Sequence, residues 1–332
     1  MYFNNTKEII QELNRAGQSH KPTLFIISFN TQEGFLYPLN KINNQNILYD
    51  FNGISNIPAH YTPSSKEFYW KPHYIPFKDY QQSFNIVTQN LLLGNSFLTN
   101  LTCATPIECN LSLKEIFYRA NAKYKLWIKN KFVVFSPEIF IQIHPDRTIY
   151  SYPMKGTIDA NEPDAKYKIL NDKKESAEHA TIVDLIRNDL SIIADKVTVS
   201  KYRYIDTITT HQGKLLQVSS EIKGILPENY LNTLGDIIFK LLPAGSISGA
   251  PKRKTVKIIT EAENYDRGFY TGIMGIYDGK KVDSAVMIRF IEQNAQGKYL
   301  FKSGGGITAK SKIHNEYNEI KQKISIDKNC KS

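Results

Sequence analysis

Four short runs of apolar and β-branched residues follow one another in the middle of the chain, and they restrict the possible folds more than any other feature. Each run has the length and composition of a strand. Connections of only a few residues join antiparallel strands, because parallel strands need a crossover of a dozen residues or more. The runs are Tyr124–Ile128, Phe132–Phe135, Ile139–His144 and Thr148–Tyr152.

The other helix and strand patterns occur in groups and do not alternate. Such an order predicts an α+β fold with large antiparallel sheets, not a series of βαβ units. The expected helices are Thr6–Ala16, Phe77–Leu93, Ser112–Asn121, Glu175–Ile193, Pro227–Leu241, a helix that ends at Glu263, and His314–Ser325. The other expected strands are Thr23–Asn30, Asn95–Thr105, Val197–Tyr204, Leu215–Ile225, Tyr270–Tyr277, Val282–Glu292 and Tyr299–Ser303.

The length of 332 residues suits one large domain or two ordinary ones, and a hydrophobic fraction of 41% supports a sizeable core. The chain contains no long linker or low-complexity run. The best candidate for a boundary is near Pro76. Residues 1–76 are therefore expected to form a short N-terminal part of the same fold, residues 77–326 the main functional region, and residues 327–332 a tail.

The net charge of +10 comes from dispersed lysines and arginines, without the dense basic cluster typical of nucleic-acid binding. No stretch approaches the ~18 apolar residues that a membrane span requires, and the N-terminus has no signal pattern. Three cysteines without metal-ligand spacing indicate reduced thiols. We expect a cytoplasmic protein that binds neither nucleic acid nor membrane.

A single lysine stands out in the stretch Tyr-Pro-Met-Lys-Gly-Thr at Tyr152–Thr157. Pro153 restricts the backbone before Lys155, and Gly156 permits a turn or a close approach after it. Because a strand-like run precedes the stretch, Lys155 is expected to point off the end of a strand.

Two pairs of glutamates have the spacing that places both members on one face of a helix. Glu175 and Glu178 begin one predicted helix, and Glu316 and Glu319 lie on the last one. Together they could hold Mg²⁺, which prefers oxygen ligands. The alternative is that each pair is a solvated helix face, and this is favoured by the neighbouring residues Lys173, Lys174 and Lys321.

Two further features could bind an anion. Ser303–Thr308 contains three consecutive glycines, whose N–H groups could surround an oxyanion, although a plain tight turn explains the glycines equally well. Arg289 interrupts an apolar run and is expected inside a strand, where a charge requires a partner. A bound carboxylate or an internal salt bridge would both satisfy it.

Taken in order, these motifs resemble those of the chorismate-utilising enzymes, a family that includes anthranilate synthases, aminodeoxychorismate synthases, isochorismate synthases and salicylate synthases. The resemblance covers Phe77–Ser325 and implies two large antiparallel sheets packed together, with helices outside and chorismate between them. It is carried by Gly94–Thr102, Ser136–Glu138, Pro153–Thr157, Glu175–Leu190, Leu242–Lys252, Asp266–Gly275, Arg289 and Gly304–Glu319.

The resemblance also implies roles for single residues. Lys155 corresponds to a lysine nucleophile and Glu138 to a general acid. Mg²⁺ would be held by Glu178 and Glu319, with Glu175 and Glu316 in support. The expected substrate-binding residues are Arg289, Tyr270, Gly304, Gly305, Gly306, Thr157, Gly245 and Ser246.

Differences between members of the family narrow the expected reaction. Members that add water have a lysine base where this chain has Leu98, and anthranilate synthases have alanine where it has Lys155. The resemblance therefore favours amination of chorismate by ammonia at C4, as in aminodeoxychorismate synthases. Ammonia is expected from a separate glutaminase subunit. The alternatives are an anthranilate synthase and, in another class, an inactive protein of this fold that binds anions or partners.

One position departs from the family pattern. The family has a histidine in the strand at Leu215–Ile225, and counting back from Gly224 places Gln217 there. His211 lies upstream and could replace that histidine only if this register is wrong.

Overall fold

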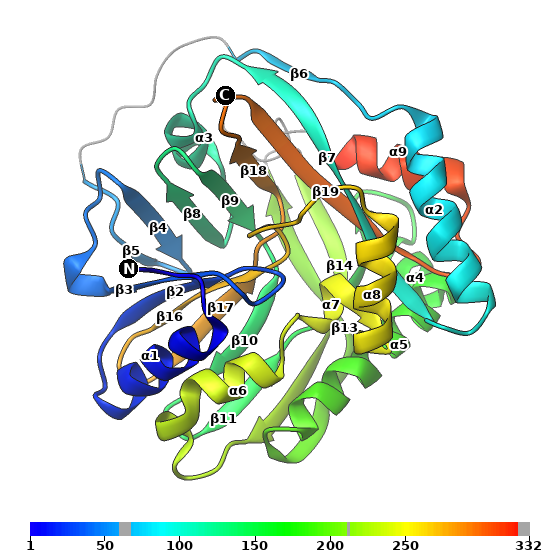
Figure 1. Ribbon diagram of the computed structural model, residues 1–332. Coiled ribbons are helices and arrows are strands. Elements are labelled where there is room, and N and C mark those ends of the chain that lie inside the picture. Colours follow the sequence, from blue (N-terminus) through cyan, green and yellow to red (C-terminus); the bar gives the residue numbers. More distant parts are fainter. Residues whose placement is uncertain (60–67, 211–212, 325–332) are drawn as a thin grey trace. The chain divides into compact units, whose positions relative to one another are not determined.

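The computed structural model describes residues 1–59, 68–210 and 213–324 (Figure 1). The chain divides into two compact units, each formed from separated segments. The first contains Met1–Asn40, Glu138–Ser246 and Ile273–Ala285, and the second contains Lys41–Pro137, Ile247–Gly272 and Val286–Ser332. Residue 76, where the sequence suggests a boundary, lies inside the second unit, and the expected tail at 327–332 lies outside the described residues.

The first unit is built on a ten-stranded sheet. Its order is β1-β3-β2-β16-β17-β10-β11-β14-β12, and β13 pairs with β14 as well. The long strand β14 thus pairs with β11, β12 and β13. The strands are β1 (Tyr2–Phe3), β2 (Thr23–Ile27), β3 (Gly34–Pro38), β10 (Ile139–Ile143), β11 (Thr148–Ser151), β12 (Met154–Asp159), β13 (Asp195–Thr210), β14 (Gly213–Ile225), β16 (Ile273–Tyr277) and β17 (Val282–Val286).

The helices of the first unit form two groups. One group packs α1 against α6 and the 3₁₀ helix Tyr230–Thr233, and the other packs α4 and α5 against β12, β13 and β14 (Figure 1). Helix α5 begins at Lys173 because the Asp172 side chain accepts a hydrogen bond from the backbone of Glu175. The helices are α1 (Thr6–Gln18), α4 (Ala165–Asn171), α5 (Lys173–Ser191) and α6 (Leu234–Lys240), and the short α7 (Gly245–Ser248) contains the boundary between the units.

The second unit is built on a nine-stranded sheet in the order β15-β7-β19-β18-β9-β8-β4-β5, with β6 paired to β7. Its longest ladder joins β7 and β19. The strands are β4 (Ile47–Phe51), β5 (Ile54–Ser55), β6 (Trp70–Pro72), β7 (Leu98–Cys109), β8 (Tyr124–Ile128), β9 (Phe132–Ser136), β15 (Gly249–Ala250), β18 (Phe290–Gln293) and β19 (Tyr299–Ile307).

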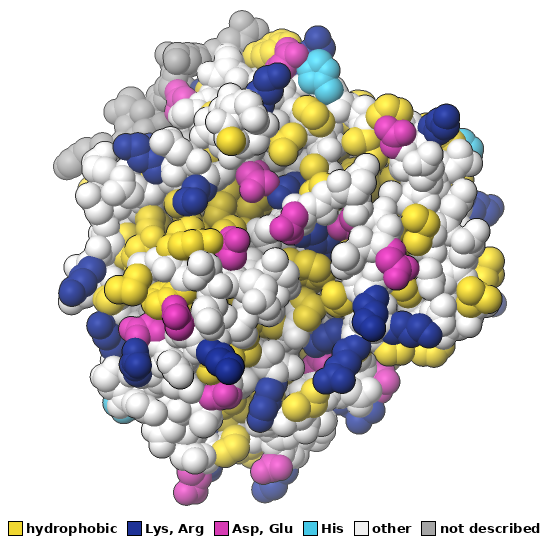
Figure 2. Space-filling view, in the orientation of Figure 1, with side chains coloured by type: hydrophobic (Ala, Val, Ile, Leu, Met, Phe, Trp, Pro, Cys, Tyr) yellow, Lys and Arg dark blue, Asp and Glu magenta, His cyan; other side chains and the backbone are white. Residues whose placement is uncertain are grey.

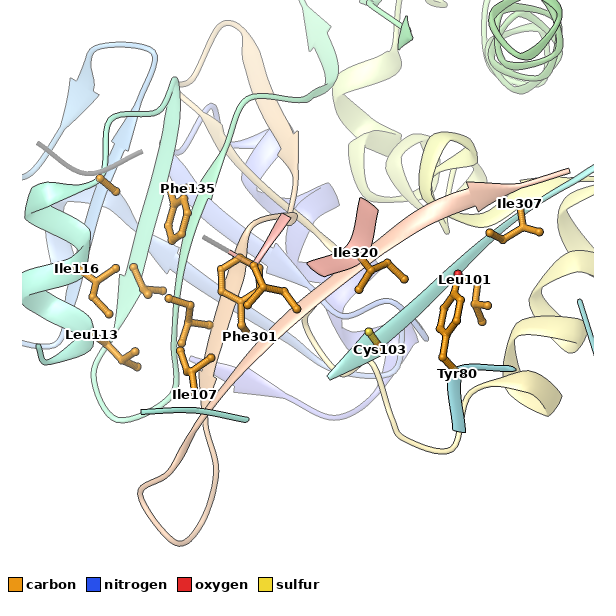
Figure 3. Close-up of a cluster of buried hydrophobic side chains, with 14 of the residues drawn as sticks. Tyr80, Leu101, Cys103, Ile107, Leu113, Ile116, Phe135, Phe301, Ile307 and Ile320 are labelled. Atoms are coloured by element: carbon orange, nitrogen blue, oxygen red, sulfur yellow. The ribbon is translucent and has the colours of Figure 1, made fainter. Parts of the chain in front are cut away.

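Four α-helices of the second unit cover its hydrophobic core. Helix α2 packs on α8 and α9, and α3 packs on β8 and β9. Side chains from these helices and from β7, β9 and β19 form a buried apolar cluster (Figure 3). Tyr80, Leu101, Phe301 and Ile320 are at most 2% exposed within it. The helices are α2 (Phe77–Leu92), α3 (Leu113–Arg119), α8 (Lys252–Ala262) and α9 (Ile313–Lys323), and a 3₁₀ turn spans Leu39–Lys41.

The structure confirms the expected α+β class with antiparallel sheets and corrects parts of the local prediction. The series of hairpins is interrupted: β8 pairs with β9 and β10 with β11, but β9 and β10 belong to different sheets. The turn Ser136–Glu138 joins the two units instead of closing a hairpin. The expected helix Pro227–Leu241 is shorter, since its first part is a separate 3₁₀ turn.

Figure 2 shows lysine and arginine side chains interspersed with aspartate and glutamate on the visible face. In the described part of the chain, every helix is too short or too polar to cross a membrane.

Candidate active site

Lys155 lies inside a strand, not off the end of one as the sequence suggests. It is the second residue of β12 and pairs with Val218 of β14. The register shifts between Lys155 and Thr157, so Gly156 forms a bulge with φ of +77°. Pairing with β14, which lies far away in sequence, extends the sheet past Pro153. The bulge changes the direction of the strand at the lysine.

The acidic pair of α5 lies beside this bulge. Glu178 Oε2 is 3.6 Å from Lys155 Nζ, and the Glu178 side chain is only 9% exposed. Glu175 reaches the same place, because a Cβ atom at Gly156 would lie 3.4 Å from Glu175 Oε2. The predicted common face of Glu175 and Glu178 is thus confirmed, and it is directed toward the lysine and its glycine.

Glu138 contacts a residue that the sequence analysis assigned to substrate. Ser246 Oγ donates a hydrogen bond to Glu138 Oε1. Ser246 belongs to α7, which approaches α5 closely at Gly245: a Cβ there would lie 3.0 Å from Leu185 Cδ2. The serine hydroxyl therefore orients the carboxyl group of Glu138. Nothing in the local sequence indicates this contact, since 108 residues separate the partners.

In the second unit, Glu316 and Glu319 converge on Gly305, as their predicted common face requires. From a Cβ at Gly305, Glu319 Oε1 would be 3.6 Å away and Glu316 Oε2 3.9 Å away. Glu316 is 4% exposed. Lys323 Nζ is 2.7 Å from Glu319 Oε1 and donates to the carbonyl oxygen of Gly304 at 2.8 Å. This lysine was not identified from the sequence.

The three glycines do not form the expected tight loop. Gly304, Gly305 and Gly306 continue β19 in register with residues 100–102 of β7. A Cβ at Gly304 would lie 2.5 Å from Thr102 Cγ2, so glycine is needed for close packing. Although glycine disfavours strands, pairing with the long β7 overrides this local preference.

Arg289 is not inside a strand. It separates β17 from β18, its backbone has a φ of +53°, and its carbonyl oxygen accepts a hydrogen bond from the backbone of Phe135. The left-handed backbone ends one strand before the next begins. Its side chain keeps accessible surface, but the surrounding protein desolvates the guanidinium group and lowers its pKa from the usual value. Tyr270, also expected at the substrate, is 3% exposed, and its ring lies 5.9 Å from that of Phe290.

A buried ion pair between Arg267 and Glu263, close to Tyr270 in the sequence, was not predicted from the sequence. Arg267 donates two hydrogen bonds to Glu263, at 2.6 and 2.8 Å, and both side chains are 2% exposed. Arg267 also donates to the backbone carbonyl groups of Asn100 and Ile247, while Glu263 accepts from the backbone and hydroxyl of Thr102. The pair fixes the end of α8 against β7, which places the Tyr270 turn. The spacing of four residues between Glu263 and Arg267 is the feature of the sequence that could have indicated this ion pair.

Gln217 pairs with Thr157 of β12 on one side and with Asp206 of β13 on the other. Its side chain therefore shares a face of the sheet with Thr157. His211, the alternative considered from the sequence, lies outside the described residues.

Of the residues expected to hold Mg²⁺, Glu175 and Glu178 lie in the first unit, and Glu316 and Glu319 lie in the second. No group of three or more histidine, cysteine, aspartate or glutamate side chains suited to a metal occurs within the described ranges. Two carboxylates suffice for Mg²⁺, which keeps several waters and takes further ligands from a substrate. The oxygen donor set of either pair therefore fits this ion.

Three comparisons with known proteins bear on this arrangement. The chain is 50% identical over 320 residues to a Haemophilus influenzae protein named "Uncharacterized PabA-like protein", covering 96% of both chains. A Schizosaccharomyces pombe protein provisionally named aminodeoxychorismate synthase is 29% identical over 295 residues, which are 84% of this chain and 39% of that one. The crystal structure of anthranilate synthase component I from Streptococcus pneumoniae matches with a TM-score of 0.66 and 25% identity, over 80% of this chain and 61% of that one.

The family comparison extends over most of the molecule. Residues 21–326 match the family described as chorismate binding enzyme, a range that includes both acidic pairs, Lys155 and Glu138. The chain therefore belongs to the family of chorismate binding enzymes.

Proposed function

We propose that this protein replaces the C4 hydroxyl of chorismate with an amino group from ammonia, giving 4-amino-4-deoxychorismate and water. The observation that carries the proposal is the position of Lys155 at the β12 bulge, with Glu178 3.6 Å from its amino group. In the first unit, the same α5–α7 region holds Glu138 through Ser246. A nucleophilic amine and a carboxyl group that can donate a proton are the two groups that this substitution needs.

The proposed steps balance as follows. Neutral Lys155 adds through Nζ to C2, both conjugated double bonds of the ring shift, and the C4 hydroxyl leaves as water after receiving a proton from Glu138. Ammonia then adds at C4, both double bonds shift back, and the lysine amine departs from C2.

The other residues of the proposed site bind and orient the substrate. Arg289, Tyr270, Thr157 and the strand Gly304–Gly306 are assigned to the substrate carboxylates, as the family resemblance implies. Glu178 and Glu319, supported by Glu175 and Glu316, would hold Mg²⁺. When bound, this ion would neutralise a carboxylate of the substrate and draw electron density from the conjugated ring.

Leu98 favours amination over hydration. It is 3% exposed in β7 and has no group that could deprotonate water. An anthranilate synthase activity is the second candidate, because the chain shares 25% identity with the S. pneumoniae enzyme of that name. In that reaction ammonia attacks C2 directly, so a lysine nucleophile has no role there.

Mass spectrometry of the product distinguishes these reactions. Incubated with chorismate, Mg²⁺ and an ammonium salt at high pH, the chain alone is expected to give the 4-amino product, and glutamine is expected not to replace ammonium. The reason is that the ammonia source is proposed to be a separate glutaminase subunit. Isochorismate or anthranilate as the product would contradict the proposed reaction, and glutamine-dependent turnover by this chain alone would contradict the proposed partner.

Replacing Glu138 with glutamine is expected to lower turnover by about 10²–10⁴, the usual contribution of a positioned general acid. The amide can still accept the hydrogen bond from Ser246 but cannot protonate the leaving hydroxyl. Chorismate binding, measured by calorimetry, should largely persist. Glu162→Gln, an exposed glutamate of the same unit, is the control. A Glu138→Gln enzyme with the wild-type rate would remove Glu138 from the mechanism.

Replacing Gly156 with alanine is expected to reduce turnover far more than stability. The positive φ costs on the order of 1–3 kcal/mol for a residue with a side chain, and the added methyl group would contact the Glu175 carboxylate. Gly297→Ala is the matched control, since Gly297 has a φ of +76° and only a glutamine side-chain atom nearby. Thermal unfolding and steady-state rates are compared for both variants. Equal rates in both would show that the bulge geometry is not needed.

A further inference from the structure

Arg203 occupies a strained position in β13 that the proposed reaction does not explain. Its φ is +50°, and the register of β13 with β14 shifts between Lys201 and Tyr204. A long side chain is costly in this left-handed conformation, so the surrounding contacts must maintain it. The backbone N–H of Arg203 donates to Ser220 Oγ of β14 at 2.9 Å. The bulge turns the arginine side chain toward α4 and α5.

The guanidinium group joins two helices. Its NH1 nitrogen donates to Ser176 Oγ of α5 at 3.0 Å, and its NH2 nitrogen donates to the carbonyl oxygen of Leu170 at 2.8 Å, in the last turn of α4. A cation there satisfies carbonyl groups that the helix itself leaves without partners. Ser176 lies between Glu175 and Glu178 in the sequence of α5. Arg203 thus holds the turn of α5 that carries both carboxylates.

A second contact attaches α5 to the same point of the sheet. His179 is 1% exposed, and its Nε2 lies 2.7 Å from Ser220 Oγ, the atom that accepts from Arg203. A hydroxyl group can accept one hydrogen bond and donate another. Ser220 can therefore accept from Arg203 and donate to His179, which connects β13, β14 and α5 at one hydroxyl group.

We propose that Arg203 is a positioning residue that fixes α5 against β12 and β14, so that Glu178 lies beside Lys155 and Glu175 beside Gly156. The inference rests on the proposed function for the roles of these carboxylates. A lysine cannot replace the arginine, because a single ammonium group cannot reproduce the planar fork that reaches Ser176 and Leu170 at once. If Arg203 is lost, the carboxylates of α5 are expected to remain but to be displaced from Lys155.

The test uses Mn²⁺ as a probe of the carboxylates, measured by electron paramagnetic resonance of the full chain with chorismate and without ammonium. Arg203→Lys is expected to bind Mn²⁺ about 10-fold or more weakly than wild type, the usual effect of losing a residue that orients a ligand. Ser176→Ala, which removes only the contact to α5, is expected to have an affinity for Mn²⁺ between those of wild type and Arg203→Lys. Arg15→Lys, a surface arginine of the same unit paired with Glu12, should bind as wild type.

Thermal unfolding of each variant separates positioning from stability. The inference requires weaker Mn²⁺ binding at a temperature where Arg203→Lys is fully folded, and recovery of binding by added guanidinium in Arg203→Ala. Wild-type affinity for Mn²⁺ in folded Arg203→Lys would overturn the inference. If Arg203→Lys does not fold, wild-type affinity in Ser176→Ala would overturn it. A wild-type chain that binds no Mn²⁺ would overturn it as well. A wild-type chain that binds Mn²⁺ but gives no aminated product would overturn only the proposed reaction.

Discussion

Replacing Lys155 with alanine is expected to abolish formation of 4-amino-4-deoxychorismate while chorismate still binds. In the proposed reaction, the lysine occupies C2 and leaves only C4 open to ammonia. Without it, any remaining amination should move to C2 and give anthranilate or its precursor. Mass spectrometry and anthranilate fluorescence measure the two products. A 4-amino product from the alanine variant at nearly the wild-type rate would mean that the proposed mechanism is wrong.

Two further measurements separate a nucleophile from a simple cationic contact. If Lys155 only pairs with a carboxylate, Lys155→Arg should keep substantial activity, because arginine also binds carboxylates. If it is the nucleophile, Lys155→Arg should be as inactive as Lys155→Ala. Mixing the wild-type chain with chorismate and no ammonia should also give a covalent adduct that peptide mapping assigns to Lys155. Lys168→Ala, an exposed lysine of α4 that pairs with Glu162, is the control.

The second large effect concerns the carboxylates. Glu178→Gln and Glu319→Gln are each expected to reduce turnover almost to zero, and excess chelator should do the same to the wild-type chain. An amide keeps the shape of the side chain but loses the charge that a hard cation requires. Full activity in excess chelator would exclude the metal.

Each variant also changes an ion pair, and this must be separated from the metal. Glu178 lies beside Lys155 and Glu319 beside Lys323. A titration of turnover with Mg²⁺ distinguishes the two effects: if a glutamate is a ligand, its variant should need more Mg²⁺ for half-maximal activity. An unchanged Mg²⁺ requirement with a lower maximal rate would assign that glutamate to its lysine partner alone.

Features that depend on neighbouring residues could be predicted from the sequence. Ser112 was expected to begin a helix, and it forms a capping box with Glu115 at the start of α3. The strand Tyr124–Ile128 has its predicted bounds, and the long helix α5 differs by two residues at each end. The glutamate pairs share helix faces because the period of a helix is a local property. The order of the motifs was sufficient to indicate the family, which residues 21–326 confirm.

Features that depend on distant partners were decided only by the tertiary structure. Gly304–Gly306 form a strand because β7 pairs with them along its length, and Lys155 lies at a bulge because β14 extends the sheet beyond Pro153. The contact of Ser246 with Glu138 joins residues 108 positions apart, and that of Arg203 with Ser176 joins residues 27 apart. Such contacts stabilise a local conformation that the residues alone disfavour, and their free energy comes from a sheet whose strands are assembled from separated segments. The residue types of the site are therefore readable in the sequence, whereas the orientation of Lys155, Glu138 and the carboxylates of α5 is a property of the folded chain.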